Sequence, residues 1–242
     1  MEIRIRLCVQ YTKGLTNNLG DIFKMISEYS IDMDDGYFSY FEDFDICDIE
    51  KMKKTINHIN IIIEYFSHIV SNPSFKVSVS IFSDKVKTEL ILPLNHILSI
   101  SKKVTEIEFY VFSWGCQKSK GIRLIEKNID IRIIFCSILH HCDVKKYELI
   151  RKTLNKEKIK YNRFNKKLLI EYTQDNTYMF DFSSIEINYE AISDDSQIGS
   201  YLKIISPWAE CSFTMPTKAL EPMLKYNHNL HIIFNTFGCV KR

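Results

Sequence analysis

The chain has 242 residues, of which 45% are hydrophobic and 26% charged, and its formal net charge is +2. This composition is typical of a globular protein with one large core or two modest ones, and it excludes a disordered tail. The longest apolar stretch, residues 59–66, contains Asn60 and Glu64 and is far too short to span a membrane. Seven scattered cysteines without a C-x-x-C pair favour free thiols, and the first residues lack a signal-peptide pattern, so we expect an intracellular protein.

The first half of the chain opens with a strand pattern followed by a helix pattern. Apolar residues alternate over 2–9, which predicts a half-buried strand. Residues 15–26 carry apolar side chains at helical spacing, as in a helix that lies on a sheet. Further strands of this half are expected at 29–32, 36–44, 75–82, 87–92 and 106–113.

Two later segments of the first half are less uniform. Residues 51–57 fit a helical turn or a loop, whereas 60–70 are rich in β-branched and aromatic residues and favour a strand. Pro93 suits the first turn of a helix, because the missing N–H of proline costs nothing there. We expect that helix to run to about Lys103.

The second half repeats this order. A strand at 129–138 precedes a helix at 144–160, and a short helix precedes the final strand at 230–237. Each half therefore has two helices and a majority of strands, too few helices for a crossover between every pair of strands. Antiparallel sheets with two helices on one face fit this count best. The other strands of this half are expected at 167–173, 178–182, 185–192, 201–205 and 209–215.

Two pairs of segments echo each other along the chain. Residues 2–8 (EIRIRLC) match 130–136 (DIRIIFC) at an offset of 128, and 92–116 align without a gap on 215–239 at an offset of 123. Such a repeat predicts an α+β fold of two tandem, similar domains. The first domain, the connector and the second domain are expected at 1–114, 115–128 and 129–242.

Enzyme and metal-site motifs are absent from the sequence. There is no Gly-rich phosphate loop, no G-x-S-x-G and no H-E-x-x-H. The cluster His140-His141-Cys142 lacks the second pair of ligands that a zinc site needs at a usable spacing. We therefore expect no catalytic residue, no metal and no cofactor.

The helix expected at 144–160 is strongly basic on one face. Residues 145–167 contain ten Lys or Arg against two Glu, a local balance of +8. On a helical wheel Lys145, Lys152, Lys156 and Lys160 gather within about 80°, opposite Tyr147, Ile150 and Leu154. A solvated surface helix would mix more Glu with its Lys, so this lysine ridge favours a polyanionic partner.

Lysines on the other expected helices extend this pattern. If all the helices lie on the same side of their sheets, these lysines line one positive surface suited to sequence-independent contact with phosphates. The candidate DNA-binding residues are Lys13, Lys24, Lys102, Lys103, Lys145, Lys152, Lys156, Lys160, Lys218 and Lys225.

The arrangement resembles the sliding-clamp fold and, more narrowly, the Hus-one-type subunits of the heterotrimeric DNA-damage checkpoint clamp, the nine-one-one complex. The resemblance is collinear over nearly the whole chain, but clamps have no sharp motif. Residues 45–60 look longer than the family pattern, and Pro222 falls inside the last expected helix. The segments of this sequence on which the resemblance to sliding clamps depends are 1–7, 19–30, 90–99, 107–109, 127–133, 167–172 and 214–234.

This resemblance implies a non-enzymatic platform of the DNA-damage checkpoint and repair in the nucleus. Two other clamp-like subunits would close a ring with it around double-stranded DNA, and the candidate lysines would contact the phosphates without reading sequence. A clamp loader and partner peptides are implied as further partners, with the peptides bound near the connector. No membrane partner is implied.

Other functions fit the same residues. Within the fold, the chain would also suit a homotrimeric replication clamp resembling proliferating cell nuclear antigen, or a viral clamp-like processivity or transcription factor. From another class, it would suit an α+β enzyme or a nucleic-acid-binding protein that forms no ring.

Overall fold

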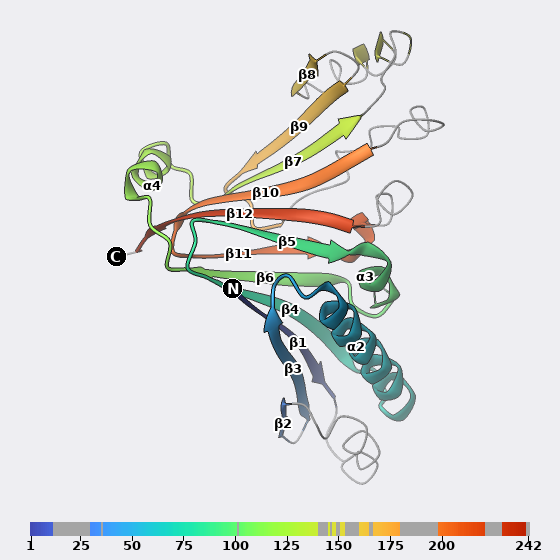
Figure 1. Cartoon of the computed structure of the whole chain (residues 1–242). Helices are drawn as coiled ribbons and strands as arrows, with labels where there is room; N and C mark the ends of the chain where they lie inside the picture. The colour runs from blue at the N-terminus through green and yellow to red at the C-terminus, as the bar shows by residue number, and fades with distance from the viewer. Residues whose placement is uncertain are drawn as a thin grey trace.

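The computed structural model describes residues 1–11, 30–34, 36–100, 102–139, 160–164, 167–179, 198–220 and 229–240, together with Lys145, Tyr147, Glu148, Arg151 and Lys152. Over these residues the fold is α+β, as expected, with two six-stranded sheets (Figure 1). The helical elements are α2 (Ile49–Ile69), α3 (Leu94–Ile100), α4 (Lys118–Ile125) and the 3-10 helix η4 (Thr217–Leu220). The strands are β1 (Glu2–Gln10), β2 (Ser30–Asp34), β3 (Tyr37–Asp45), β4 (Ser74–Ser83), β5 (Lys87–Pro93), β6 (Glu106–Ser113), β7 (Arg132–Leu139), β8 (Lys160–Phe164), β9 (Lys167–Asp175), β10 (Ile198–Trp208), β11 (Glu210–Pro216) and β12 (Asn229–Cys239).

The two sheets have equivalent strand orders with one exchange between them. The first sheet is ordered β11-β6-β4-β1-β3-β2 and the second β5-β12-β10-β7-β9-β8. Each sheet takes five strands from one half of the chain, but β5 of the first half pairs with β12, and β11 of the second half pairs with β6. The boundaries at 1–114 and 129–242 stay a prediction, and neither range contains a complete sheet.

Both sheets are mixed, so the expectation of purely antiparallel sheets is wrong. Strand β4 runs parallel to β6, and β10 runs parallel to β12. Parallel neighbours need a crossover connection rather than a tight hairpin. Here the chain leaves β4, runs back through β5 in the other sheet and turns again through α3. Strand β6 therefore starts in the same direction as β4.

Helix α2 replaces the strand that was expected at 60–70. Asp48 caps the helix, because its side chain accepts a hydrogen bond from the backbone N–H of Lys51 at 2.9 Å. Burial of the apolar stripe outweighs the weak helix propensity of the β-branched residues, since each fully buried side chain contributes roughly 1.5–3 kcal/mol. The stripe follows helical spacing and consists of Met52, Ile56, Ile59, Ile62, Ile63 and Phe66.

The helix after Pro93 forms as predicted, whereas its counterpart in the second half is short where it is described. Helix α3 begins at Leu94, and η4 begins at Thr217, directly after Pro216. Each proline ends a strand, so the local pattern repeats in both halves. Residues 221–228, where Pro222 was expected to disturb the helix, lie outside the described residues.

The expected connector at 115–128 contains α4, a helix that the sequence did not predict. It contacts β10 and β12 and lies at the opposite end of the strands from α3 (Figure 1). Gly121 permits this close packing, because a Cβ atom there would stand 2.5 Å from Sγ of Cys239. The connector is therefore held against the second sheet.

One hydrophobic core joins the buried faces of the two sheets and the inner sides of α2 and α3. Every second residue of β1 is buried, as the alternation predicted: Ile3, Ile5, Leu7 and Val9. The intervening residues lie on the other, partly exposed face of the sheet. Of the strands expected at 178–182 and 185–192, Met179 forms only an isolated bridge with Thr214, and 180–197 lie outside the described residues.

Candidate functional site

Three of the predicted DNA-binding lysines lie close together next to the helices. Lys102 and Lys103 are exposed directly after α3, and Lys218 is exposed on η4. Thr217 ties these segments together, since its hydroxyl group lies 2.7 Å from the carbonyl oxygen of Val104. Contacts from α2 to α3 and from α3 to η4 make the three helices one continuous row.

Helix α2 adds two exposed lysines that the sequence interpretation missed. Lys51 and Lys54 are both exposed on α2, Lys54 opposite the buried stripe and Lys51 at its flank. Exposed carboxylates on the same helix, Glu50 and Glu64, offset part of this charge, and Glu50 pairs with Lys53 at 2.6 Å. The signal that would have revealed these lysines is the helical spacing of the apolar residues between 52 and 66.

The helix expected at 144–160 has helical backbone at its described residues before Lys160. Lys145 and Lys152 have helical backbone and exposed side chains. Tyr147, predicted to face the sheet, lies 4.4 Å beneath the guanidinium of Arg163 and packs against the ring of Tyr161 at 6.4 Å. The amphipathic pattern is thus correct at these positions.

Lys160 does not belong to that helix, so its place on the lysine ridge is wrong. It begins β8 and pairs with Glu171 of β9 in an antiparallel register. Residues 160–164 pair with 167–171 of β9 and so have strand rather than helical backbone. The remaining candidates lie outside the described residues: Lys13, Lys24, Lys156 and Lys225.

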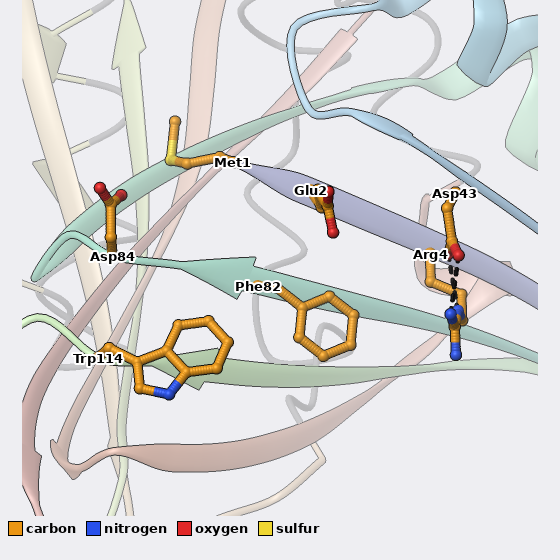
Figure 2. Close-up of a pocket in the computed structure, with 7 residues that line it drawn as sticks. All are labelled: Met1, Glu2, Arg4, Asp43, Phe82, Asp84 and Trp114. Carbon is orange, nitrogen blue, oxygen red and sulfur yellow. Dashed lines mark hydrogen bonds and ion pairs between the residues drawn. The ribbon is translucent and has the colours of Figure 1, made fainter.

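The partly exposed face of the first sheet holds a pocket of about 590 Å³. Figure 2 shows its lining side chains, which project from the start of β1, from or just after the ends of β3 and β4, and from the residue directly after β6. No sequence motif marks this pocket, because its residues come from four separate segments that meet only across the sheet. They are Met1, Glu2, Arg4, Asp43, Phe82, Asp84 and Trp114.

Two aromatic side chains form the apolar part of this pocket. Trp114 is 71% exposed, although its backbone N–H donates to the carbonyl of Ser83 at 2.9 Å and so fixes its position. Phe82 stacks on Phe112, with ring centroids 5.3 Å apart and an angle of 10° between the planes. An exposed indole beside a braced phenyl ring is a ready contact surface for a partner.

Acidic groups dominate the polar part of the pocket. Arg4 is already neutralised by Asp43, to which its Nε and Nη2 each donate at 2.7 Å. This hydrogen bonding raises the pKa of Arg4 above its usual value. Among the residues that the structure describes, Glu2 and Asp84 have no ion-pair partner.

Phe112 also lines a second pocket, of about 320 Å³, together with Tyr110 and Trp208. The indole N–H of Trp208 donates to Asp130 at 3.2 Å, which fixes that ring. Burial raises the pKa of the Cys211 thiol in this pocket to about 12. At neutral pH this thiol is therefore protonated and a weak nucleophile.

Within the described residues, no group of three or more His, Cys, Asp and Glu is arranged to hold a metal ion. The cluster 140–142 lies outside those residues. None of the helices within the described ranges has the length and apolar character of a membrane span.

Comparison with known proteins assigns no family to the chain. No family model matches it, and no curated protein matches its sequence. Among solved structures, the small subunit of acetolactate synthase from Thermotoga maritima aligns with a TM-score of 0.19 and 12% identity, covering 86% of this chain and 98% of that one. A TM-score this low carries no argument about fold or function.

Proposed function

We propose that the chain is a non-enzymatic sliding-clamp subunit that encircles double-stranded DNA as part of a ring and acts as a platform in the DNA-damage checkpoint and repair. The observation that carries this proposal is the equivalent strand order of the two sheets. A chain made of repeated sheet units suits a ring, because like units placed in succession can build a closed wall.

The outermost strands support ring closure. Strands β2 and β8 end the two sheets and lie at opposite extremes of the molecule (Figure 1). Within the described residues each pairs with one neighbour, β3 and β9 respectively. Free strand edges can pair with another subunit through backbone hydrogen bonds, which would join subunits head to tail.

Exposed lysines support DNA as the molecule inside the ring. They gather along the α2-α3-η4 row and recur at Lys145 and Lys152. Lysine contacts phosphate as a flexible point charge and does not select bases. In a closed ring, weak contacts of this kind hold the protein in register while leaving it free to slide.

One feature favours the homotrimeric alternative over a ring of three different chains. Strand β2 contains Asp32 and Asp34 and no basic residue, whereas β8 contains Lys160 and Arg163 and no acidic residue. The two outer strands therefore have opposite formal charge, which suits contact between copies of the same chain. In a heterotrimer these strands would meet partner strands instead.

Release from DNA on cutting tests the ring. The protein, with any subunits that copurify with it, is loaded on closed circular plasmid, washed in high salt, and the plasmid is then cut once. We expect retention on the circle and loss after the cut, because only a topological link survives salt and fails at a free end. Equal retention before and after cutting would exclude an encircling ring.

The mass of the purified chain separates the two kinds of ring. A stable trimer of about three times 28.6 kDa would support the homotrimeric clamp. A monomer that enters a ring only with two other clamp-like chains would support the checkpoint heterotrimer.

A further inference from the structure

We propose that the pocket between Trp114 and Asp84 binds an arginine side chain of a partner peptide. The proposal concerns the first sheet alone and does not depend on ring formation or DNA binding. It rests on the exposed indole of Trp114, the half-buried ring of Phe82 and the carboxylates of Glu2 and Asp84, all of which line one opening (Figure 2).

The aromatic side of the pocket suits a planar cation. Trp114 offers an indole that is 71% exposed, and Phe82 lies beside it. A cation over an indole face is attracted by the ring electrons, and tryptophan is the strongest aromatic partner in such contacts. The ring of Phe82 is held by its stack on Phe112, so binding a ligand against this ring costs little side-chain entropy.

The charge of the pocket points to the same ligand. Arg4 and Asp43 satisfy each other, so the carboxylates of Glu2 and Asp84 are the lining charges left without an ion pair among the described residues. With Asp43, Arg4 and the N-terminal ammonium of Met1 counted as well, the lining has a net charge of −1, which favours a cationic side chain. An anionic ligand would meet repulsion from both groups.

Arginine fits this arrangement better than lysine. Its guanidinium is flat and stacks on an indole while its N–H groups donate to carboxylates at its edge. A lysine ammonium is compact and more strongly hydrated, so it exploits the indole face less well. The volume of about 590 Å³ exceeds that of one arginine side chain, so it also accommodates neighbouring side chains of a peptide.

The test uses an immobilised library of random octapeptides probed with the full chain. We expect the bound peptides to be enriched in arginine, and their dissociation constants to rise roughly tenfold for Trp114→Ala and for the double variant Glu2→Gln with Asp84→Asn. The control variant, Glu126→Gln, removes an exposed carboxylate directly after α4 and is expected to bind as the wild type does. Replacing the selected arginine by lysine should weaken binding, and replacing it by glutamine should abolish it.

Emission from Trp114 gives a second readout that does not depend on the library. The chain has two tryptophans, so Trp208→Phe leaves Trp114 as the sole reporter. A selected peptide should change this emission in a saturable manner. The proposal is overturned if arginine is not enriched, if the pocket variants bind as the wild type does, or if the emission does not respond. Neutralising the pocket leaves the helical lysines intact, so DNA retention by these variants separates failure here from failure of the clamp proposal.

Discussion

Arg132 of β7 donates two hydrogen bonds to Asp175 of β9, at 2.6 and 2.7 Å. The first sheet contains the same arrangement, in which Arg4 of β1 donates twice to Asp43 of β3. In both sheets the paired residues are direct cross-strand partners. Arg132 is also the residue that the sequence repeat aligns with Arg4, so the echo between 2–8 and 130–136 extends to a side-chain contact and its position in the sheet.

The two ion pairs are expected to make similar contributions to stability. Double-mutant cycles with Arg132→Met and Asp175→Asn, and with Arg4→Met and Asp43→Asn, should each give a coupling of about 0.5–1 kcal/mol in urea unfolding at neutral pH. The value is modest because the side chains of Arg132 and Asp175 are 31% and 39% exposed. A coupling present in one sheet and absent in the other would show that the pairs are not equivalent.

Acid should remove the contribution of Asp175. Hydrogen bonding from Arg132 holds the pKa of Asp175 below its ordinary value. Its stabilising effect is therefore complete above the unfolded pKa of about 3.9 and is lost as the pH falls through the lowered folded pKa. Urea unfolding between pH 6 and pH 2 should show a smaller acid loss for Arg132→Met than for the wild type, and equal losses would contradict this linkage.

Gly238→Ala should destabilise the attachment of the connector. Gly238 has φ of +73°, and a Cβ atom there would collide with the backbone oxygen of Gly115. We expect a loss of about 1–3 kcal/mol in the free energy of unfolding, because backbone strain and a steric clash add together. As a control, Ser119→Ala on the exposed side of α4 should change it by less than about 0.5 kcal/mol. Equal unfolding midpoints for the two variants would contradict the strained turn.

Protonation of His58 is expected to lower the free energy of unfolding as the pH falls below neutral. Burial lowers its pKa; nearby Lys54 lowers it further, and Glu42 opposes the change. The neutral ring lies 3.3 Å from the hydroxyl of Tyr40. A depressed folded pKa means that stability is complete above the unfolded value of about 6.5 and is lost as the pH falls toward the folded value.

Thermal unfolding at pH 7.5 and pH 5.5 tests this effect. The decrease in Tm between these values should be smaller for His58→Gln than for the wild type. His68→Gln, which changes an exposed histidine of the same helix, should leave the decrease unaltered. The assignment is excluded if both variants behave alike.

The lysines of the helical side should govern the salt dependence of DNA binding. Lys145→Ala, Lys152→Ala and Lys156→Ala combined should reduce the slope of log K against log salt by as much as about 2.7 if all three contact phosphates. Lys51→Ala with Lys54→Ala should reduce it by as much as about 1.8. Lys51, Lys54, Lys145 and Lys152 are exposed, and we expect all of these variants to keep the fold, which circular dichroism would check.

A matched control comes from α4. Lys118→Ala with Lys120→Ala removes two exposed lysines at the end of the strands opposite α3, and it should change the slope little. If this control lowers the slope as much as Lys51→Ala with Lys54→Ala, DNA does not prefer the helical side. That result would overturn the proposed orientation of the ring.

Local patterns predicted the elements whose structure depends mainly on their own residues. Alternation over 2–9 correctly placed β1, because one buried face imposes a period of two on such a strand. Pro93 correctly marked the start of α3, and Tyr147 correctly marked the inner side of the basic helix. The candidates Lys102, Lys103 and Lys218 are exposed for a similarly local reason, since each lies in or directly after a short helix whose inner side is apolar.

Local patterns predicted the wrong element where contacts with distant residues favour another one. Residues 60–70 have strand-like composition, yet they belong to α2, because their helical stripe covers the core. Lys160 continues the helical wheel of the preceding residues, yet it belongs to β8 and pairs with β9. In both places the sequence is compatible with either structure, and contacts with distant residues select one.

The sequence by itself determined the α+β class, the repeat and the basic character of the second-half helix, because these follow from the spacing of neighbouring residues. Only the tertiary structure decided that β5 and β11 exchange sheets, that two strand pairs are parallel, and that Trp114 meets Glu2 and Asp84 in one pocket. Sheet partners are chosen by burial and backbone hydrogen bonding across more than a hundred residues of chain, as between β5 and β12, and no local pattern records that choice.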